Sequence, residues 1–411
     1  MRNSFLKSLL GLLLVLVLWL GLQPSTALAV SSEQRFVSEV WRIVSRAYLD
    51  ETFNHQNWWL TRQRFLKQPM PDRAAAYQAA QEMLASLEDP YTRLLQPDQY
   101  RSLQTSTSGE LTGVGLQITR DAEQKFLKVI APIEGSPAAK ADVQPRDRIL
   151  AINGISTDTF TLDEAASQMR GPIGSQVNLR IGREEREFDI TLVRDRITLN
   201  PVYADLRIQP DGKRIGYLRL SQFNANAADE IREAILLLEE QNAAGYILDL
   251  RNNPGGLLQA GIEITRLWLD QGTIVYTVNR QGILDSITAH GPALTDDPLV
   301  VLVNQGTASA SEILAGALKD NGRAVLIGDV TFGKGLIQSL FDLSDGSGLA
   351  VTVAKYETPN HSDINKLGIQ PNYKVPLEPI AREQVATAAD TQYQAAIDIL
   401  CASNTVLAEA P

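Results

Sequence analysis

Residues 215–320 alternate short apolar runs with longer amphipathic segments, and this alternation constrains the fold more than any other feature of the chain. The short runs predict strands and the longer segments predict helices. A strand–helix–strand alternation predicts an α/β domain with parallel strands. Ligand sites in that architecture lie beyond the carboxyl ends of the strands. The predicted strands are 215–220, 245–250 and 299–303, and the predicted helices are 227–241, 257–269 and 311–320.

The region before this domain has two different patterns. Residues 32–48 and 73–87 carry apolar side chains at three- and four-residue spacing, which predicts a small helical domain. Turn-forming residues follow, and we expect the Thr/Ser stretch 105–109 to be a linker. From about residue 110 to residue 196, short strands alternate with Gly and Pro, which predicts a compact β-rich domain. Its strands are expected at 127–130, 148–152 and 176–181, with one helix at 162–170.

The first 29 residues have the features of a secretory signal peptide. Arg2 and Lys7 precede an apolar run over residues 9–22, and an Ala-Leu-Ala sequence ends at Ala29. A membrane anchor is the alternative, but the run is shorter than the roughly 20 apolar residues that a spanning helix needs. We therefore expect cleavage near Val30 and an exported protein. The lone Cys401 allows no intramolecular disulfide, and we expect it to pack in a helix over 384–400.

The charge and the predicted boundaries limit the class of protein. The 411 residues include 38 basic and 48 acidic ones, and the net charge of −10 argues against a nucleic-acid binder. Only three histidines, His55, His290 and His361, are available as an imidazole base. The predicted parts are a signal peptide at 1–29, a helical domain at 30–105, a β-rich domain at 106–197, an α/β domain at 198–380 and a helical segment at 381–411.

Ser309 stands between a predicted strand and the helix that follows it. Ser309-x-x-Glu312 has the pattern of a helix capping box, which is a sufficient structural explanation for both residues. A serine at such a turn also lies over unpaired backbone N–H groups at the positive end of a helix, and these stabilise a developing oxyanion. The N–H of Ala310 is the first expected donor.

Lys334 is the candidate base for this serine, because a serine hydroxyl needs a neighbouring group to take its proton. It lies between Gly333 and Gly335, which permit close approach of the backbone. Apolar residues nearby in the sequence can exclude water from its ammonium group. Burial would lower the pKa of the lysine toward neutrality, as a base requires. An ordinary exposed loop lysine is the alternative. A phosphate loop is excluded, because Gly335 stands where that motif has Ser or Thr.

Two glycine-containing segments are further candidates. Residues 249–256 end in Gly255 and Gly256 between a predicted strand and a helix, so a glycine N–H could be a second oxyanion donor, although a tight turn explains the pattern equally well. In the β-rich domain, Gly113, Val114, Gly115 and Leu116 form a glycine loop that leads into a strand. Such a loop can offer N–H groups to a carboxylate while the strand edge pairs with a peptide.

The glycine loop, together with residues 135–140 and 147–154, resembles a PDZ domain. The segments 306–312 and 331–335 resemble the carboxyl-terminal-processing (tail-specific) proteases, whose catalytic Ser and Lys have the same separation of 25 residues. The resemblance implies a multi-domain α/β protein with crotonase-like parallel strands. It also implies roles for single residues: Ser309 as nucleophile, Lys334 as base, Gln338 as a group that positions the lysine, and Ala310 with Gly255 or Gly256 as oxyanion donors. Residues 113–116 would bind the substrate C-terminus, and no metal or cofactor is implied.

Residues 89–95, 345–353 and 363–368 are similar to the photosynthetic subgroup of that family, which removes a tail from the membrane-embedded photosystem II reaction-centre precursor. The resemblance implies a monomeric enzyme that is soluble after signal cleavage, in the thylakoid lumen or periplasm. An ideal strand separates positions four apart by roughly 13 Å, so contact of Gln338 with Lys334 requires a bend. Two alternatives remain: a PDZ-type protein that binds C-terminal peptides without cutting them, and a protease with a triad that uses His290 or His361.

Overall fold

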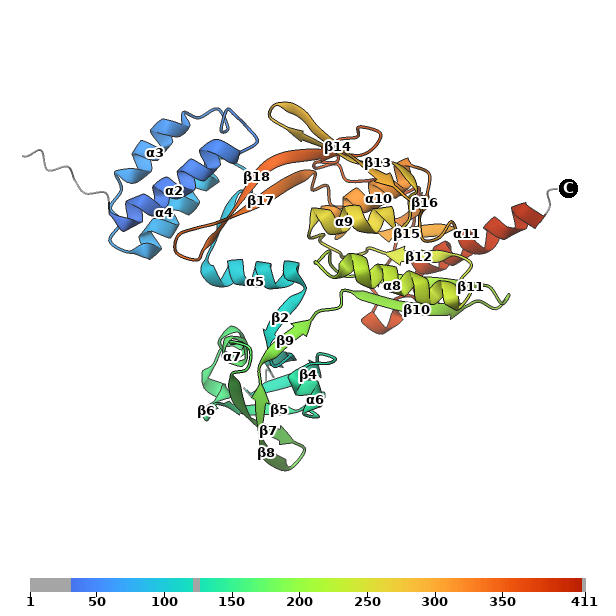
Figure 1. The fold of residues 1–411 in the computed structure, drawn as a ribbon, viewed down its shortest axis with the longest axis horizontal. Helices are drawn as coiled ribbons and strands as arrows, with labels where there is room; N and C mark the ends of the chain where they lie inside the picture. Colours follow the sequence, from blue (N-terminus) through green and yellow to red (C-terminus); the bar gives the residue numbers. More distant parts are fainter. Residues whose placement is uncertain (1–30, 121–125, 409–411) are drawn as a thin grey trace, which may run out of the picture. The chain divides into compact units, whose positions relative to one another are not determined.

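The computed structural model describes residues 31–120 and 126–408, so the predicted signal peptide lies outside the described residues. The chain divides into two compact units, residues 1–48 with 52–94, and residues 49–51 with 95–411. Each unit is described by itself, and Figure 1 gives the element labels. No helix of the described ranges has the length and apolar character needed to cross a membrane.

The first unit is helical, as the periodicity predicts. It contains α2 (Ser32–Ala47), α3 (Trp58–Leu66) and α4 (Arg73–Ala85). A capping box of Ser31 and Gln34 starts α2, and its apolar face is buried. The sequence did not indicate α3, because a nine-residue helix with polar Thr61 on its buried face has a weak periodic signal. Strand β1 (Arg93–Leu95) stands at the junction of the units.

The expectation of a linker at residues 105–109 is wrong, because most of this stretch belongs to helix α5 (Pro97–Ser108). Pro97 starts the helix and Gly109, at φ 68°, ends it in the left-handed conformation. Within the helix the hydroxyl of Thr107 donates to the Leu103 carbonyl at 2.9 Å. Serine and threonine can satisfy their hydroxyls in this way, so their accumulation did not signal a loop here.

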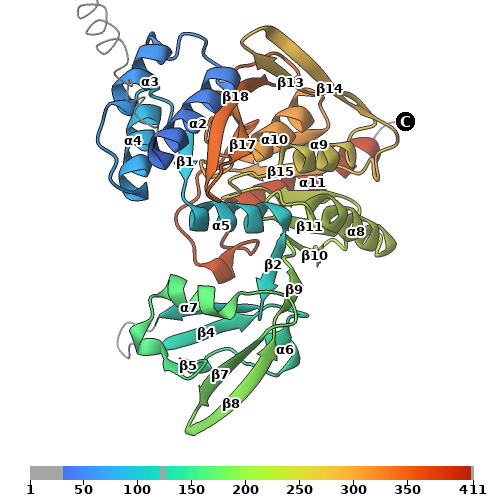
Figure 2. The ribbon, with the colours of Figure 1, turned by 60° about the vertical axis from the view of Figure 1, so that its left-hand side comes forward.

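The β-rich domain, called here the PDZ-like domain, has a sheet in the order β3-β4-β5-β7-β8, with β6 beside β5. The strands predicted over 127–130, 148–152 and 176–181 and the helix over 162–170 are all confirmed. The paired strands β2 and β9 connect this domain to the rest of its unit (Figures 1 and 2). Its elements are β2 (Glu110–Gly113), β3 (Leu116–Arg120), β4 (Leu127–Pro132), α6 (Pro137–Lys140), β5 (Arg148–Ile152), β6 (Ile155–Ser156), α7 (Leu162–Met169), β7 (Gln176–Arg183), β8 (Arg186–Val193) and β9 (Asp195–Thr198).

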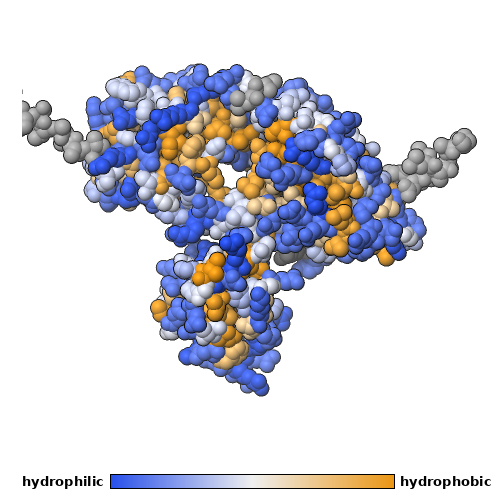
Figure 3. Space-filling view, in the orientation of Figure 1, coloured by the Kyte–Doolittle hydropathy of each residue, from blue (hydrophilic) through white to orange (hydrophobic). Residues whose placement is uncertain are grey.

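The PDZ-like domain has its own apolar core and leaves other apolar side chains uncovered. Leu127, Ile149 and Leu179 are fully buried in that core. Orange apolar areas are visible on the surface of this domain in Figure 3, and six large apolar residues of the domain are substantially exposed: Ile130, Ile155, Leu162, Ile173, Phe188 and Val193. A small domain cannot cover all of its apolar surface, so these residues need no special explanation one by one.

The α/β domain is built on a six-stranded sheet, in the order β10-β11-β12-β15-β16-β19. The strands from β11 to β19 are parallel, which confirms the prediction from the alternating pattern, and β10 is antiparallel. The bounds are β10 (Val202–Ile208), β11 (Arg214–Leu220), α8 (Ala227–Glu240), β12 (Tyr246–Asp249), α9 (Leu258–Arg266), β15 (Leu299–Val303), α10 (Ala310–Asp320), β16 (Ala324–Gly328) and β19 (Tyr373–Lys374).

Alternate side chains of the central strands enter two apolar cores. Leu248 and Val301 pack with α8, α9 and α10, whereas Ile247 and Val300 pack with α11 (Thr391–Ala408) on the other face (Figure 1). Helix α11 begins later than the predicted residue 384, because Asp390 accepts hydrogen bonds from Ala386 N and Tyr393 N and so fixes the start at Thr391.

A second, antiparallel sheet in the same unit was not predicted. It contains β13 (Gln271–Asn279), β14 (Gly282–His290), β17 (Leu336–Asp342) and β18 (Gly348–Glu357). β18 lies between β13 and β17, and register shifts interrupt the β13–β14 and β17–β18 pairs. Irregular pairing weakens the two-residue alternation by which strands are detected in a sequence.

Candidate active site

Ser309 occupies the turn between β15 and α10 with a strained backbone. Its φ of 58° and ψ of −118° lie outside the regions that residues with a side chain normally adopt. Such strain costs about 1–3 kcal/mol and persists where the surrounding structure enforces it, often at functional sites. The predicted capping box of Ser309 and Glu312 is present, and the Glu312 N–H is also bonded to the Ser309 carbonyl at 2.8 Å. Ser309 therefore has a more specific conformation than a helix cap requires.

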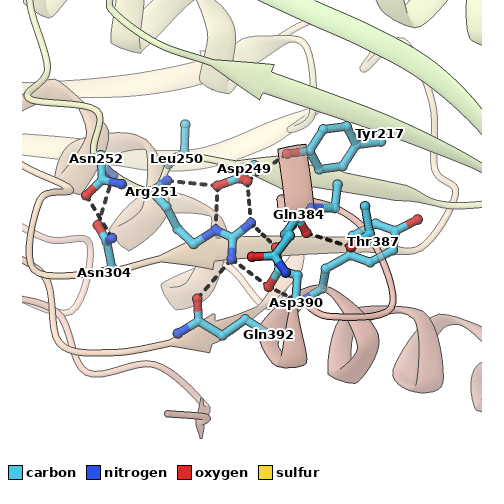
Figure 4. A network of polar contacts seen from close by, with 12 residues as sticks. Tyr217, Asp249, Leu250, Arg251, Asn252, Asn304, Gln384, Thr387, Asp390 and Gln392 are labelled. Carbon is cyan, nitrogen blue, oxygen red and sulfur yellow. Dashed lines mark hydrogen bonds and ion pairs between the residues drawn. The ribbon is translucent and has the colours of Figure 1, made fainter. Parts of the chain in front are cut away.

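The loop before Ser309 is bonded to the loop that follows β12. The Asn304 carboxamide oxygen accepts from the N–H of Asn252 at 2.9 Å, and the two side chains are also bonded to each other (Figure 4). The Thr307 hydroxyl donates to the Leu250 carbonyl at 2.9 Å. These bonds join the carboxyl ends of neighbouring parallel strands, β12 and β15, where the architecture predicts a site.

The structure separates the roles of Gly255 and Gly256, which the sequence could not distinguish. A Cβ atom at Gly255 would lie 2.6 Å from the Ala308 carbonyl oxygen and 2.9 Å from Ala310 N. A Cβ at Gly256 would instead lie 2.1 Å from the Phe223 carbonyl oxygen. Gly255 is therefore the glycine that lies beside the Ser309 turn. Its own N–H donates to the Asn253 side chain at 2.9 Å, which fixes the turn.

The buried Glu312 carboxylate connects the serine segment to the lysine segment. Its Oε2 atom accepts from the backbone N–H of Ser309 and from that of Lys334, each at 2.9 Å. Its Oε1 atom accepts from Gly333 N at 2.7 Å and from the Thr331 hydroxyl at 2.6 Å. One carboxylate therefore holds both motifs, although they are 25 residues apart in the chain. The sequence indicated Glu312 only as part of a capping box, and no signal in it pointed to the second partner.

Lys334 and Gln338 lie on either side of the start of β17. Lys334 is half-buried, and Gln338 faces β18, where its Nε2 atom donates to the Thr352 hydroxyl at 3.4 Å. The strand pairing has an irregularity between Ile337 and Gln338. A bulge bends a strand and changes which face its side chains occupy, so the spacing of an ideal strand does not apply between these two positions.

A buried ion-pair network supports the strand end before Gly255. Arg251 binds Asp249 through Nε at 2.9 Å and through Nη2 at 2.7 Å, and it binds both carboxylate oxygens of Asp390 (Figure 4). Tyr217 and Gln392 complete the network with bonds to Asp249 and Arg251. Burial alone would raise the pKa of Asp390, but the hydrogen bonds and charge of Arg251 outweigh burial, and the pKa of this carboxyl is lowered. The sequence did not reveal this network, because Asp390 is far from Arg251 in the chain.

The glycine loop of the PDZ-like domain has free N–H groups beside an edge strand. The carbonyls of Val114 and Gly115 accept from Ala138 N at 2.9 Å and Ile133 N at 2.8 Å. Within the described residues, no hydrogen bond engages the N–H groups of Val114 and Gly115. Gly113 ends β2, and Leu116 begins β3, which is an edge strand of its sheet. The arrangement fits an acceptor group at the loop and an extended peptide along β3.

Within the described part of its unit, neither His290 nor His361 is hydrogen-bonded to Ser309. His361 is exposed, stacks on Tyr276 and lies 3.2 Å from the Glu357 carboxylate, and His290 is exposed at the end of β14. In the ranges that the structure describes, no cluster of three or more His, Cys, Asp or Glu side chains could hold a metal ion.

The fold and the site define a peptidase domain joined to a PDZ domain. The model of peptidase family S41 matches residues 214–375, and the PDZ domain model matches residues 128–183. The chain is 60% identical over 402 residues to a carboxyl-terminal-processing protease of Picosynechococcus sp., with 97% of each chain covered. The chain therefore belongs to the carboxyl-terminal-processing proteases of peptidase family S41, and it is a serine protease of this family.

Plant and structural relatives agree with this membership. Carboxyl-terminal-processing peptidase 2 of Arabidopsis thaliana, described as chloroplastic, is 46% identical over 358 residues, which cover 84% of this chain and 70% of the relative. The solved structure of a photosystem II D1 C-terminal processing protease has a TM-score of 0.57 and 41% identity, and the match covers 88% of this chain and 100% of that one. The expected family and the multi-domain α/β fold with a PDZ domain are thereby confirmed.

Proposed function

We propose that the chain cleaves C-terminal tails of proteins with Ser309 as nucleophile and Lys334 as general base. The observation that carries this proposal is the shared Glu312 carboxylate, whose Oε2 atom binds the N–H groups of both residues. Shared binding of the Ser309 and Lys334 segments to one buried carboxylate is expected if the two segments function together. The strained Ser309 backbone supports the same assignment.

The chemistry follows from these positions. Ser309 Oγ attacks the scissile carbonyl carbon while Lys334 Nζ accepts the hydroxyl proton, and the carbonyl oxygen becomes an oxyanion. Ala310 N–H, at the start of α10, stabilises this negative charge. The second donor is assigned to a glycine of the Gly255–Gly256 turn, in which the Gly255 N–H is bonded to the Asn253 side chain. The C–N bond then breaks, and the leaving amine takes the proton from Lys334. Water hydrolyses the acyl-enzyme with Lys334 again as base, which restores Ser309. Gln338 positions the lysine in this scheme.

Substrate capture is assigned to the PDZ domain. The N–H groups in the 113–116 loop would bind the terminal carboxylate of a tail, and the edge of β3 would pair with the residues before it. The photosystem II D1 processing structure, at 41% identity, supports a photosystem II reaction-centre precursor as the substrate. Cyanobacterial and chloroplastic relatives support a place in the thylakoid lumen or periplasm, reached through a cleaved signal peptide, where we propose that the enzyme acts as a soluble monomer.

The decisive experiment compares the wild-type chain with Ser309→Ala and Lys334→Ala on a tail-bearing precursor peptide, followed by mass spectrometry. Both variants should lose at least a thousandfold in kcat and keep their folded structure by circular dichroism, because each removes a group that acts in the chemical step. Ser311→Ala is the matched control, since its hydroxyl donates to the Asn253 carbonyl at 3.0 Å. Substantial cleavage by Ser309→Ala at the same bond would refute the assignment.

A further inference from the structure

Tyr356 places its hydroxyl between the backbones of the two proposed catalytic residues. It lies near the end of β18 and is only 1% exposed. The hydroxyl oxygen is 2.5 Å from the Lys334 carbonyl oxygen and 3.0 Å from the Ser309 carbonyl oxygen. The two carbonyl oxygens are therefore no farther apart than the sum of these distances. This tyrosine touches both peptide units and has no place in the scheme described above.

The Tyr356 hydroxyl can donate its one proton to only one of the two carbonyl oxygens that it contacts. A phenol has one proton to donate, and the shorter distance is to Lys334. The Ser309 carbonyl already accepts from the N–H groups of Glu312 at 2.8 Å and Ile313 at 3.1 Å. The Tyr356 proton therefore goes to the Lys334 carbonyl, and the phenol oxygen lies directly against the Ser309 carbonyl. The Tyr356 hydroxyl therefore holds the Lys334 carbonyl by a hydrogen bond. By van der Waals contact it limits how closely the Ser309 carbonyl can approach.

Tyr356 can hold this spacing because its own backbone is fixed on both sides. Its N–H donates to the Gly335 carbonyl at 3.0 Å, next to Lys334. β18 pairs with β17 through Lys355 and with β13 through Tyr356 itself. Glu312 binds the N–H groups of Ser309 and Lys334, whereas Tyr356 meets their carbonyl groups, so the backbone of each residue is held at both its N–H and its carbonyl.

We propose that Tyr356 is a positioning residue that sets the separation between Ser309 and Lys334 and thereby the efficiency of proton transfer. The proposal rests on the proposed function, since it needs Ser309 and Lys334 to act together. Tyr356 does not contact substrate in this role. Its removal should therefore slow the chemical step and leave substrate binding unchanged, because a misplacement of about 1 Å between reacting groups can cost roughly a hundredfold in rate.

The test is Tyr356→Phe, which deletes the hydroxyl and keeps the ring. With a tail-bearing peptide, kcat should fall at least tenfold while KM stays within twofold. The acidic limb of the pH profile of kcat should move to higher pH, because a lysine that leaves its half-buried position holds its proton more tightly. Tyr246→Phe is the matched control: Tyr246 is fully buried, and its hydroxyl donates to Glu239 at 2.6 Å, far along the chain from either motif. This control should lose similar thermal stability and keep the wild-type kcat and pH profile.

The outcomes separate this proposal from the function on which it rests. If wild-type cleavage does not depend on Ser309, the function fails. If it does, and Tyr356→Phe retains the wild-type kcat and acidic limb, or Tyr246→Phe loses as much activity, the positioning role is overturned. Should Tyr356→Phe not fold, a ring-fluorinated tyrosine at position 356 keeps the packing and ionises at lower pH. The basic limb of kcat should then move down, since a phenolate cannot donate to Lys334, and an unmoved limb overturns the proposal.

Discussion

A single buried carboxylate, that of Glu312, lies between the two proposed catalytic residues, Ser309 and Lys334. The Glu312 carboxylate is the acceptor in all four of its hydrogen bonds, and two of the donors are the N–H groups of Ser309 and Lys334. A carboxylate satisfies four donors because it only accepts, whereas a carboxamide of the same shape presents an NH2 group to two of them. Glu312 thus fixes a geometry that a neutral residue of equal size would disturb.

We therefore expect Glu312→Gln to lower kcat by roughly tenfold to a hundredfold, because the misplaced donors shift the Ser309 and Lys334 segments. Steady-state cleavage of the precursor peptide measures this effect. Glu263→Gln is the matched control, since Glu263 is exposed on α9 and accepts a hydrogen bond from the neighbouring Gln259 side chain at 2.8 Å. A Glu312→Gln enzyme as active as the control would show that the bridge is dispensable.

At the residue scale, the sequence predicted the residues whose chemistry is visible in their own motifs. Ser309 and Lys334 stand in recognisable segments with a defined separation. Tyr356 and Asp390 could not be found in this way, because each acts through a contact that only the tertiary structure creates. The sequence left open whether Gly255 or Gly256 lies closer to the Ser309 turn. The closeness of Gly255 to Ala310 is a tertiary contact, which only the structure shows.

At the scale of elements, the segment before α11 supports the end of β12, just before the Gly255–Gly256 loop. Asp390 caps α11 and binds Arg251, which in turn binds Asp249 at the end of β12. The Asp390 side chain is fully buried, and Arg251 is nearly so. Removing one partner of a buried pair leaves uncompensated charge, which costs about 3–5 kcal/mol.

Asp390→Asn should therefore lower the free energy of unfolding by about 3 kcal/mol near neutral pH. The lowered pKa of Asp390 also gives a sign for the pH dependence. The unfolded chain binds this proton at about pH 4 and the folded chain only at lower pH, so the stabilisation is complete above about pH 5 and is lost as the pH falls through the folded-state pKa. Urea denaturation at several pH values measures both effects.

The free energy of unfolding of the Asp390→Asn variant should fall less than that of the wild type as the pH is lowered into the acid range. Asp189→Asn is the matched control, because Asp189 and its partner Arg180 are both well exposed, and the substitution should change stability little. Equal effects of the two substitutions would show that the buried network does not stabilise the fold.

The elements that the sequence predicted are those with a regular period. Strands β11, β12 and β15 and helices α8, α9 and α10 follow the expected ranges closely, because fully buried parallel strands form continuous apolar runs. The β17–β18 pair, with its bulge, and α5, with its Thr and Ser residues, escaped prediction because a register shift or a local hydroxyl bond overrides the pattern.

At the scale of the whole molecule, the chain combines a peptide-binding module with a peptidase. The open N–H groups at Val114 and Gly115 bind a terminal carboxylate in the proposed function, whereas Ser309 acts on a bond upstream. Binding and cutting are then performed by different domains of the chain. A substrate whose terminal carboxylate is blocked should lose the first interaction and keep the second.

Cleavage of one precursor peptide, prepared with a free carboxylate or as the C-terminal amide, tests this division. A hydrogen bond to a charged group contributes about 1.5–3 kcal/mol, so kcat/KM for the amide should be roughly tenfold to a hundredfold lower, mainly through KM. Fluorescence anisotropy with Ser309→Ala, which cannot cut, should show the same preference in Kd. Equal cleavage and equal binding of the two peptides would remove the carboxylate from recognition, whereas a preference in kcat alone would mean that the terminal carboxylate promotes the chemical step and does not anchor the tail.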